Sequence, residues 1–412
     1  MYEISPVSPF DALVVGRGAV GAAAALGLAQ SGMRVGVVAP AGGVAHATGG
    51  AGARRGPDDW DPRVFALSPA SHKLLRGLRV WDALDATRIA PIYDMRVYPS
   101  STAGAPELHF CAYEACVDAL AWIVENDNLM SALERALGFA GVAAVDGEVA
   151  GIDTETQGGA TVTLADGRTL RARLVVGADG ARSPLRGLLG IGVSERDYPQ
   201  RAVVANFETS RPHRDCAYQW FGDHGILALL PLPGDRCSIV WSAPGGLADT
   251  LAQLDAETLA RRVSEVSGHA LGELRLITPA QSFPLRLIQV ERTVAHRVAL
   301  VGDAAHVVHP LSGQGMNLGF GDVQVLLDTV RAREPFRDPG DRILLRRYER
   351  ARREVVAAMR LTTDGLQRLF DPESDPASTL LLRPLVGARE LGWRLVASSS
   401  WLKRRLIAHA AS

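Results

Sequence analysis

Three glycine-containing stretches have residue types and spacing that suit the binding of a phosphate-bearing ligand. The first is Gly16-x-Gly18-x-x-Gly21, which follows the apolar run at 12–15 and precedes an alanine-rich segment. In a strand–turn–helix of this kind, the glycines permit a tight turn, a close approach to a pyrophosphate and close packing of the helix on the strand. The free N–H groups at the start of the helix attract the phosphates. This stretch therefore predicts a dinucleotide site.

The second stretch, RLVVGADGARSPLR at 173–186, leads from an apolar strand into Asp179 and Gly180. A turn followed by a helix with proline in its first turn explains Gly180 and Pro184. It does not explain the full Asp-Gly-x-x-Ser-x-x-Arg spacing. We therefore interpret Asp179 and Gly180 as candidate ligand contacts.

The third stretch begins with a buried strand that ends in Gly302 and Asp303. A carboxylate at the carboxyl end of a parallel strand lies where open α/β sheets bind ligands. A new helix follows the turn HPLSGQG, and its first backbone N–H groups are free to bind an anionic ring oxygen. The residues that carry these N–H groups are Gly315, Met316 and Asn317.

The composition argues against several other classes of protein. The chain has 44 basic and 45 acidic residues, so no positive field recruits nucleic acid. Its four cysteines form no CxxC pair, which predicts reduced thiols in a cytoplasmic protein. His306 and His309 have no HExxH pattern and no evident carboxylate partner, so we interpret them as structural and expect no metal site. No stretch approaches the roughly 20 apolar residues that span a bilayer.

The hydrophobic pattern predicts the elements that position these stretches. A strand at 12–15, a helix at 19–31 and a strand at 34–38 predict a parallel βαβ unit. We further expect helices over 68–84 and 126–138, a β-meander over 142–176, and antiparallel strands at 201–208, 225–232 and 237–243. The prediction is an α/β fold with a Rossmann-like domain of parallel sheet plus β-meander. We also predict a second domain with a mainly antiparallel sheet, and a helical segment at the C-terminus.

With the three stretches in this order, the sequence resembles the flavoprotein aromatic hydroxylases, FAD monooxygenases of the p-hydroxybenzoate hydroxylase type. The resemblance extends from Asp11 to about Val330. Within that class the chain is similar to the ubiquinone-biosynthesis hydroxylases, on the stretches DPRVFALSPASHKLLRGLRVWDAL, WIVENDNLMSAL, GILALLPLPGDRCSIVW and GDAAHVVHPLSGQGMNLGFGDV. It implies an FAD-binding domain made of 1–75, 108–186 and 285–340, a substrate domain made of 76–107 and 187–284, and a helical segment at 341–412.

The resemblance also implies a role for each motif residue. Gly16, Gly18 and Gly21 would hold the ADP part of FAD, and the Arg63 guanidinium would bridge the diphosphate. The other implied contacts are Asp179 and Gly180 at the pyrophosphate and in the step that uses NAD(P)H, Gly302 and Asp303 at the ribitol, Gly315, Met316 and Asn317 at the flavin N1/C2 carbonyl, and Pro310 near the isoalloxazine.

The implied reaction belongs to the flavin. NAD(P)H reduces FAD, the reduced flavin captures O2, and a C4a-hydroperoxyflavin hydroxylates the aromatic ring of a polyprenylated phenol in ubiquinone biosynthesis. We expect a substrate sheet over the flavin to exclude water. Tyr218, Trp220 and Trp241 are candidate cavity residues, and ordinary core aromatics are the alternative interpretation. The sequence shows no unambiguous catalytic base.

Two other functions stay open at this point. One is hydroxylation of a different, small aromatic substrate, and the other is a non-catalytic FAD-bound subunit of a quinone-synthesis complex. A flavin halogenase is disfavoured because the chain has no WxWxIP segment and its only lysines are Lys73 and Lys403.

The C-terminal segment is the expected partner surface. Residues 341–412 contain 14 basic and 8 acidic side chains with apolar residues between them. We favour a helical tail that packs on its own FAD domain or on another ubiquinone-biosynthesis protein. The alternative is a peripheral contact of 381–410 with the anionic inner membrane, with Trp393 and Trp401 near the interface.

One position departs from the family pattern. Ala39 ends the second strand, where an acidic residue usually holds the adenosine ribose. We expect a backbone group, a water or one of Asp58, Asp59 and Asp61 to replace it.

Overall fold

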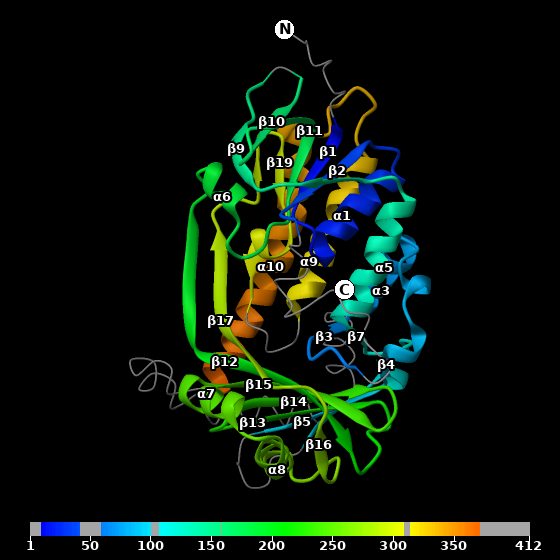
Figure 1. Cartoon of the computed structure of the whole chain (residues 1–412), viewed down its shortest axis with the longest axis vertical. Coiled ribbons are helices and arrows are strands. Elements are labelled where there is room, and N and C mark those ends of the chain that lie inside the picture. Colours follow the sequence, from blue (N-terminus) through cyan, green and yellow to red (C-terminus); the bar gives the residue numbers. More distant parts are fainter. Residues whose placement is uncertain (1–9, 42–58, 100–106, 157, 309–313, 371–412) are drawn as a thin grey trace.

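A mixed sheet forms the upper part of the molecule in Figure 1. The computed structural model describes residues 10–41, 59–99, 107–156, 158–308 and 314–370. The sheet has the order β18-β19-β11-β1-β2-β8, and β10 and β9 continue antiparallel from β11. Its strands are β1 (Phe10–Val15), β2 (Val35–Ala39), β8 (Ala143–Asp146), β9 (Val149–Asp153), β10 (Ala160–Leu164), β11 (Thr169–Gly177), β18 (Val294–Ala295) and β19 (Val298–Leu300). β1 pairs in parallel with β2 and β11, which confirms the predicted βαβ unit.

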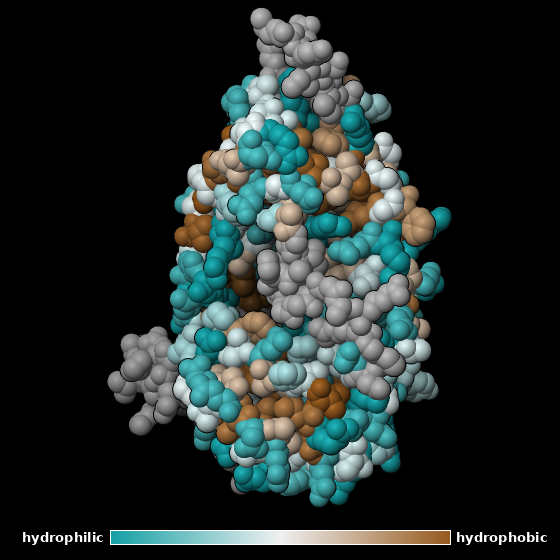
Figure 2. Space-filling model, in the orientation of Figure 1, coloured by the Kyte–Doolittle hydropathy of each residue, from teal (hydrophilic) through white to brown (hydrophobic). Residues whose placement is uncertain are grey.

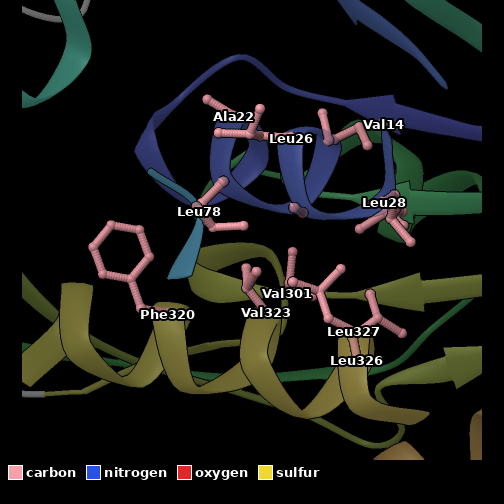
Figure 3. Packing of buried hydrophobic residues seen from close by; sticks show 14 of the residues in the cluster. Val14, Ala22, Leu26, Leu28, Leu78, Val301, Phe320, Val323, Leu326 and Leu327 are labelled. Carbon is pink, nitrogen blue, oxygen red and sulfur yellow. The ribbon is translucent and has the colours of Figure 1, made fainter. Parts of the chain in front are cut away.

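Small side chains let helix α1 (Ala19–Gln30) pack closely on this sheet. Every residue of α1 from Ala19 to Leu28 is buried except Val20. A side chain at Gly27 would overlap Leu327 of α9 (Gln314–Arg331), so that glycine allows the two helices to approach. Figure 3 shows Leu327 of α9 pointing toward α1. α5 (Asn126–Phe139) packs on α1 as well, and its buried leucines join the same core.

A second, larger sheet forms the lower part of the molecule (Figure 1). Its order is β20-β17-β12-β15-β14-β13-β5-β6, and β16 pairs with β12. Its strands are β5 (Asp94–Tyr98), β6 (Leu108–Cys111), β12 (Val193–Thr209), β13 (Cys216–Gly222), β14 (Gly225–Leu232), β15 (Arg236–Pro244), β16 (Leu274–Leu276), β17 (Gln281–Val290) and β20 (His306–Val307). All neighbours are antiparallel except β13 and β5. Helices α7 (Gly245–Gln253) and α8 (Ala256–Val266) cover one face, which we call the outer face.

The opposite, inner face of the large sheet meets a small third sheet. That sheet has the order β3-β7-β4 and consists of β3 (Val64–Leu67), β7 (Ala121–Glu125) and β4 (Ile89–Ile92). Ala217 and Leu232 of the large sheet share an apolar core with Trp60, Ile92 and Ile123. The two main parts of the molecule are therefore joined through packed side chains.

The remaining helices follow strands of these sheets or pack beside them. α3 (Pro69–Gly77) follows β3, α4 (Ala112–Ala115) follows β6, and α6 (Pro184–Leu188) follows β11. The long α10 (Arg342–Phe370) runs past α9, and the Tyr348 hydroxyl donates a 2.7 Å hydrogen bond to the Leu300 carbonyl at the end of β19. Within the part of the chain that the structure describes, no helix is long and apolar enough to cross a bilayer.

The predicted fold class is confirmed, and most differences concern boundaries. The helix expected over 68–84 ends at Gly77, because Arg79 adopts a left-handed conformation with φ of 58°. The meander expected over 142–176 loses its first strand, since β8 pairs in parallel with β2 instead.

The predicted domain boundaries differ at three strands. β6, assigned to the FAD-binding domain, pairs with β5 in the large sheet. β4, assigned to the substrate domain, pairs with β7 in the small sheet. β17 pairs with β12 on both sides of the boundary that was expected at 284/285, over 281–284 and, after a register shift, over 286–290. These pairings join residues far apart in the chain, which a local hydrophobic pattern does not encode. The helical C-terminus is confirmed over α10, and 371–412 lie outside the described residues.

Candidate cofactor and substrate site

The glycines of the first motif form the turn between β1 and α1. Gly16 has φ of 108°, and a Cβ there would overlap the Ala178 carbonyl oxygen. A Cβ on Gly21 would overlap the Gly16 carbonyl oxygen, so both positions require glycine for packing. A Cβ on Gly18 would meet nothing within 4 Å. Gly18 is the exposed N-cap of α1 and has no side-chain cap, so open space lies beside the free N–H groups of this helix.

The third motif places a carboxylate directly below that turn. Gly302, with φ of 59°, lies against the Val20 side chain of α1, so the Gly302–Asp303 turn and the glycine motif are neighbours. The Asp303 side chain has exposed surface, yet desolvation by the surrounding protein raises the pKa of its carboxyl group. Both properties are expected of a carboxylate that projects into a hollow. The charges of His306 and Arg63 act in the opposite direction and lower this pKa.

A buried ionic network supports the Gly302–Asp303 turn. Asp322 of α9 accepts hydrogen bonds from the Gly302 amide at 2.9 Å, His306 Nε2 at 2.8 Å and Arg352 Nε at 2.6 Å. Burial would raise the pKa of Asp322, but these partners outweigh it and hold the pKa below its usual value. The expectation that His306 lacks a carboxylate partner is therefore wrong, because helix α9 brings Asp322 back to it. Its interpretation as structural agrees with its burial; His309 lies outside the described residues.

The second motif ties the two others together. Arg186 of α6 is buried and donates hydrogen bonds to the carbonyls of Ala181 at 2.7 Å and Ala304 at 3.0 Å. Asp179 Oδ2 accepts the Leu185 amide at 3.0 Å, which explains one function of this carboxylate as a cap of α6. Desolvation raises the pKa of Asp179 against the hydrogen bonds from Ser183 and Leu185. Its Oδ1 is buried without a partner among the described residues.

The N-terminus of α9 lies next to β3 and α3. The Asn317 amide donates to the Ala66 carbonyl at 2.9 Å, and its Oδ1 accepts the Ser68 amide at 2.9 Å and the Ser71 hydroxyl at 2.7 Å. The Asn317 side chain is thus a structural clamp that sequence reasoning did not predict. α9 begins at Gln314, so the backbone N–H groups of Gly315 and Met316 precede its first i→i−4 bond and have no acceptor within the helix. Their contact with the flavin stays a prediction, and Pro310 lies outside the described residues.

Arg63 lies between the large sheet and the Gly302–Asp303 turn, which we call the cofactor turn. Its guanidinium lies 5.9 Å from the ring centre of Phe283 on β17, and its charge acts on Asp303. The backbone around it is fixed: the Arg63 carbonyl accepts the Asn126 amide, and the Arg63 amide donates to Asp61 at 2.9 Å. This position agrees with the expectation of a cation that contacts a diphosphate beside Asp303.

Asp61 is not free to replace the missing ribose carboxylate. Its Oδ1 accepts the Arg63 amide and its Oδ2 accepts the Asp127 amide at 3.1 Å, and the residue is 2% exposed. We therefore withdraw Asp61 from the residues expected to compensate for Ala39. Asp58 lies outside the described residues, and Asp59 is exposed with its carbonyl bound by Arg88.

The three aromatic cavity candidates lie on the outer face of the large sheet. Trp241 and Trp220 are both register partners of Leu227, and Tyr218 is the partner of Leu229. Register partners share a face, and this face forms the core beneath α7 and α8. Trp241 is fully buried there, and its indole N–H donates to the His224 carbonyl at 2.8 Å. Trp241 is therefore a core aromatic, whereas Tyr218 and Trp220 are partly buried and pack against the same core from the outer face.

The inner face of the same strands is the surface turned toward the cofactor turn. Ala217 and Leu230 on this face pack with Trp60, and Asn206 Nδ2 donates to the Asp61 carbonyl at 2.8 Å. Figure 2 shows a hollow between the upper and lower parts with hydrophobic residues at its bottom. Sequence reasoning missed this face because strand alternation defines two faces without saying which one is covered by helices.

These features fit FAD better than a metal or an ordinary apo fold. A helix N-terminus with open space, an exposed but desolvated carboxylate and an unpartnered Asp179 oxygen belong to turns that lie against one another. Within the described residues no group of three or more His, Cys, Asp or Glu is arranged to hold a metal ion.

Residues 9–362 match the family model described as "FAD binding domain". The chain belongs to this family. It is 38% identical to the ubiquinone hydroxylase UbiL of Rhodospirillum rubrum over 404 residues, which cover 97% of this chain and 89% of the relative. It is 34% identical to the 3-demethoxyubiquinol 3-hydroxylase of Escherichia coli over 411 residues, 98% of each chain. A mutant of PqsL from Pseudomonas aeruginosa is similar in structure, with a TM-score of 0.72 and 27% identity over 89% of this chain and 98% of PqsL.

The family match establishes the enzyme class. The protein is an FAD-dependent monooxygenase of the aromatic hydroxylase type, and FAD is its cofactor. The resemblance inferred from the three motifs is therefore confirmed at the level of family, fold and cofactor.

Proposed function

We propose that the protein hydroxylates the aromatic ring of a polyprenylated phenol in ubiquinone biosynthesis, with NAD(P)H as electron donor and O2 as oxidant. The observation that carries this proposal is that Arg63 links the large sheet to the Gly302–Asp303 turn, since its guanidinium lies 5.9 Å from the ring centre of Phe283 and its charge acts on Asp303. The names of the UbiL and demethoxyubiquinol hydroxylase relatives support the same substrate class.

The described residues would hold successive parts of FAD, from the pyrophosphate through the ribitol to the flavin ring. The N-terminus of α1 at Gly18 would receive the pyrophosphate, with Arg63 on its other side. Asp303 would accept a hydrogen bond from a ribitol hydroxyl, and the 315–317 amides would bind the anionic edge of the flavin ring. When bound and reduced, FAD supplies the activation of O2 for transfer of an oxygen atom to the ring.

The protein's own contribution is to orient the ring and to exclude water. The inner face presents Leu230, Ala228 and Val240 to the hollow, and these side chains suit an aromatic ring with an apolar substituent. Excluding water protects the activated oxygen from unproductive decay.

Further partners are part of this proposal. A membrane-borne polyprenyl substrate requires access from a bilayer or from another biosynthetic protein. The sequence at 381–410 is basic, a charge that suits either contact. We propose a cytoplasmic enzyme with peripheral contact at the inner membrane.

Deletion of the gene followed by mass identification of the accumulated quinone precursor tests the function. We expect one prenylated ring that lacks a single hydroxyl group, restored to normal by the wild-type gene. Normal quinone levels after deletion would contradict the proposal. Accumulation that is reversed by a variant unable to be reduced by NAD(P)H would instead indicate a non-catalytic subunit.

A further inference from the structure

Hydrogen bonds from three parts of the fold hold the segment that leads into Arg63. Asp61 is 2% exposed, and its backbone N–H donates to Glu125 Oε1 at 2.6 Å. Its backbone carbonyl accepts Asn206 Nδ2 at 2.8 Å. Its two carboxylate oxygens accept the amides of Arg63 at 2.9 Å and Asp127 at 3.1 Å. One residue therefore ties the chain before Arg63 to the junction of β7 and α5 and to the large sheet.

The backbone of Arg63 is fixed on both sides. The Asp61 carboxylate closes a turn, because it accepts the amide two residues further along the chain. Pro62 restricts φ in the middle of that turn. The Arg63 carbonyl accepts the Asn126 amide at 3.0 Å, and β3 begins at the next residue, Val64. The direction in which the Arg63 side chain leaves the backbone is thereby determined before a ligand binds.

The Arg63 side chain extends from this fixed backbone toward the cofactor turn. Its guanidinium lies 5.9 Å from the ring centre of Phe283, and its charge lowers the pKa of Asp303. A long side chain loses rotamer freedom when it binds a ligand, and a fixed backbone reduces what must still be ordered. Affinity for an anion at Arg63 therefore depends on the groups that fix its backbone.

The carboxylate of Glu125 is held in place in turn. Glu125 is 2% exposed and forms an ion pair with Arg88. Arg88 also donates to the Asp59 carbonyl, and its guanidinium lies 4.5 Å from the ring centre of Trp60. The two residues before Asp61 are thus attached to the same arginine that orients its acceptor.

Asn206 supplies the contact from the large sheet. Its side chain is fully buried, and its Oδ1 is buried without a partner among the described residues. An unpaired amide oxygen in the interior costs free energy, which a leucine of similar volume would avoid. The favourable part of this side chain is its bond to the Asp61 carbonyl, which crosses from the large sheet to the segment before Arg63.

We propose that Asp61 is a positioning residue for the cofactor, which holds Arg63 in the conformation that contacts the diphosphate of FAD, and that Asn206 extends this control to the large sheet. Asp61 is buried and acts through Arg63. The inference rests on the placement of FAD given under the proposed function. It makes the affinity for FAD depend on a residue of the substrate sheet through one guanidinium.

The test is a double-mutant cycle on the dissociation constant of FAD, measured by titration of the full-length apoprotein. Asp61→Ala and Arg63→Ala should each raise Kd about tenfold, the usual size of one charge-assisted hydrogen bond. The double variant should match Arg63→Ala within about twofold, because no guanidinium is left to position. Asn206→Leu should raise Kd about threefold in the wild type and leave it unchanged in the Arg63→Ala background.

Thermal unfolding of the apoproteins separates this effect from a loss of stability. Asp61→Ala should lower the melting temperature equally in both backgrounds, whereas its effect on Kd should appear only where Arg63 is present. Asp153→Ala is the matched control, because Asp153 also accepts the amide two residues further on, at Glu155, and should leave Kd unchanged. If Asp61→Ala does not fold, Asp61→Asn, which keeps one acceptor oxygen, should show the same pattern.

An equal rise in Kd when Asp61→Ala is added to Arg63→Ala would overturn this inference alone. An unchanged Kd in Arg63→Ala would overturn it together with the placement of Arg63 at the diphosphate. The proposed reaction is judged by the quinone precursor that accumulates after gene deletion, so its failure is distinguishable from both of these results.

Discussion

Arg352 of α10 donates a 2.6 Å hydrogen bond to Asp322 of α9, and both side chains are buried. The same carboxylate holds the Gly302 amide and His306. A helix near the end of the described chain therefore fixes the turn that presents Asp303 to the cofactor. The position of α10 therefore supports the turn that we expect to bind the cofactor.

Arg352→Leu should lower the free energy of unfolding by about 3–5 kcal/mol, because it leaves Asp322 buried without its cation. Chemical denaturation of the apoprotein measures this. Arg353→Leu is the matched control, since Arg353 is the exposed next residue and its loss should cost under about 0.5 kcal/mol. Equal effects of the two variants would show that the network contributes little.

Gly18→Ala and Gly21→Ala should separate cofactor binding from folding. Gly18 has φ of −67° and open space around it, so alanine should fold normally but intrude on the pyrophosphate and weaken FAD binding at least roughly tenfold. Gly21→Ala should destabilise the apoprotein by about 1–3 kcal/mol through overlap with the Gly16 backbone. FAD titration and thermal unfolding test the pair, and loss of stability in Gly18→Ala would contradict our assignment.

Asp303→Asn should weaken FAD binding yet stabilise the apoprotein. Because desolvation raises the pKa of Asp303 in the folded state, its contribution to stability falls as pH rises through that pKa. The neutral asparagine removes this penalty at pH 7 and also removes the charged ribitol acceptor, which lowers affinity by about 1.5–3 kcal/mol. Melting curves of apo wild type and variant should converge as the pH is lowered. A lower apo melting temperature in the variant at pH 7 would refute this explanation.

Trp241→Ala should affect stability without affecting substrate affinity. Removing this fully buried indole from the core beneath α7 and α8 should cost about 3–5 kcal/mol. KM of the folded fraction for the phenol should match that of the wild type, because Trp241 points away from the inner face. A selective rise in KM with unchanged unfolding free energy would return Trp241 to the cavity.

The motifs could be predicted from the sequence because each is local. Gly16, Gly18 and Gly21 act within one turn, and Gly302 with Asp303 acts at the end of one strand. Their packing consequences, such as the overlap of a Gly21 Cβ with the Gly16 carbonyl, need only neighbouring residues.

The parts that could not be predicted depend on contacts distant in the chain. Strand alternation placed Tyr218 and Trp241 on one face, but only packing of α7 and α8 shows that this face is the outer one. The partner of His306 is Asp322, which is 16 residues away on α9. The orientation of that carboxylate depends on Arg352 of α10 as well. From the sequence, Asp61 was a candidate to hold the ribose, because one of its two amide partners, Asp127, is 66 residues away and cannot be inferred locally.

β17 has a consequence for how such enzymes can diverge. The strand carries Phe283 beside Arg63 at one end, and near its other end Ile288 and Gln289 pair with β20 at His306. β17 thus belongs both to the sheet whose inner face we expect to contact the substrate and to the strand pairing beside the Gly302–Asp303 turn. Replacing the whole large sheet with that of a relative would therefore also displace the Gly302–Asp303 turn. We expect new substrate specificities to arise by single replacements on the inner face instead.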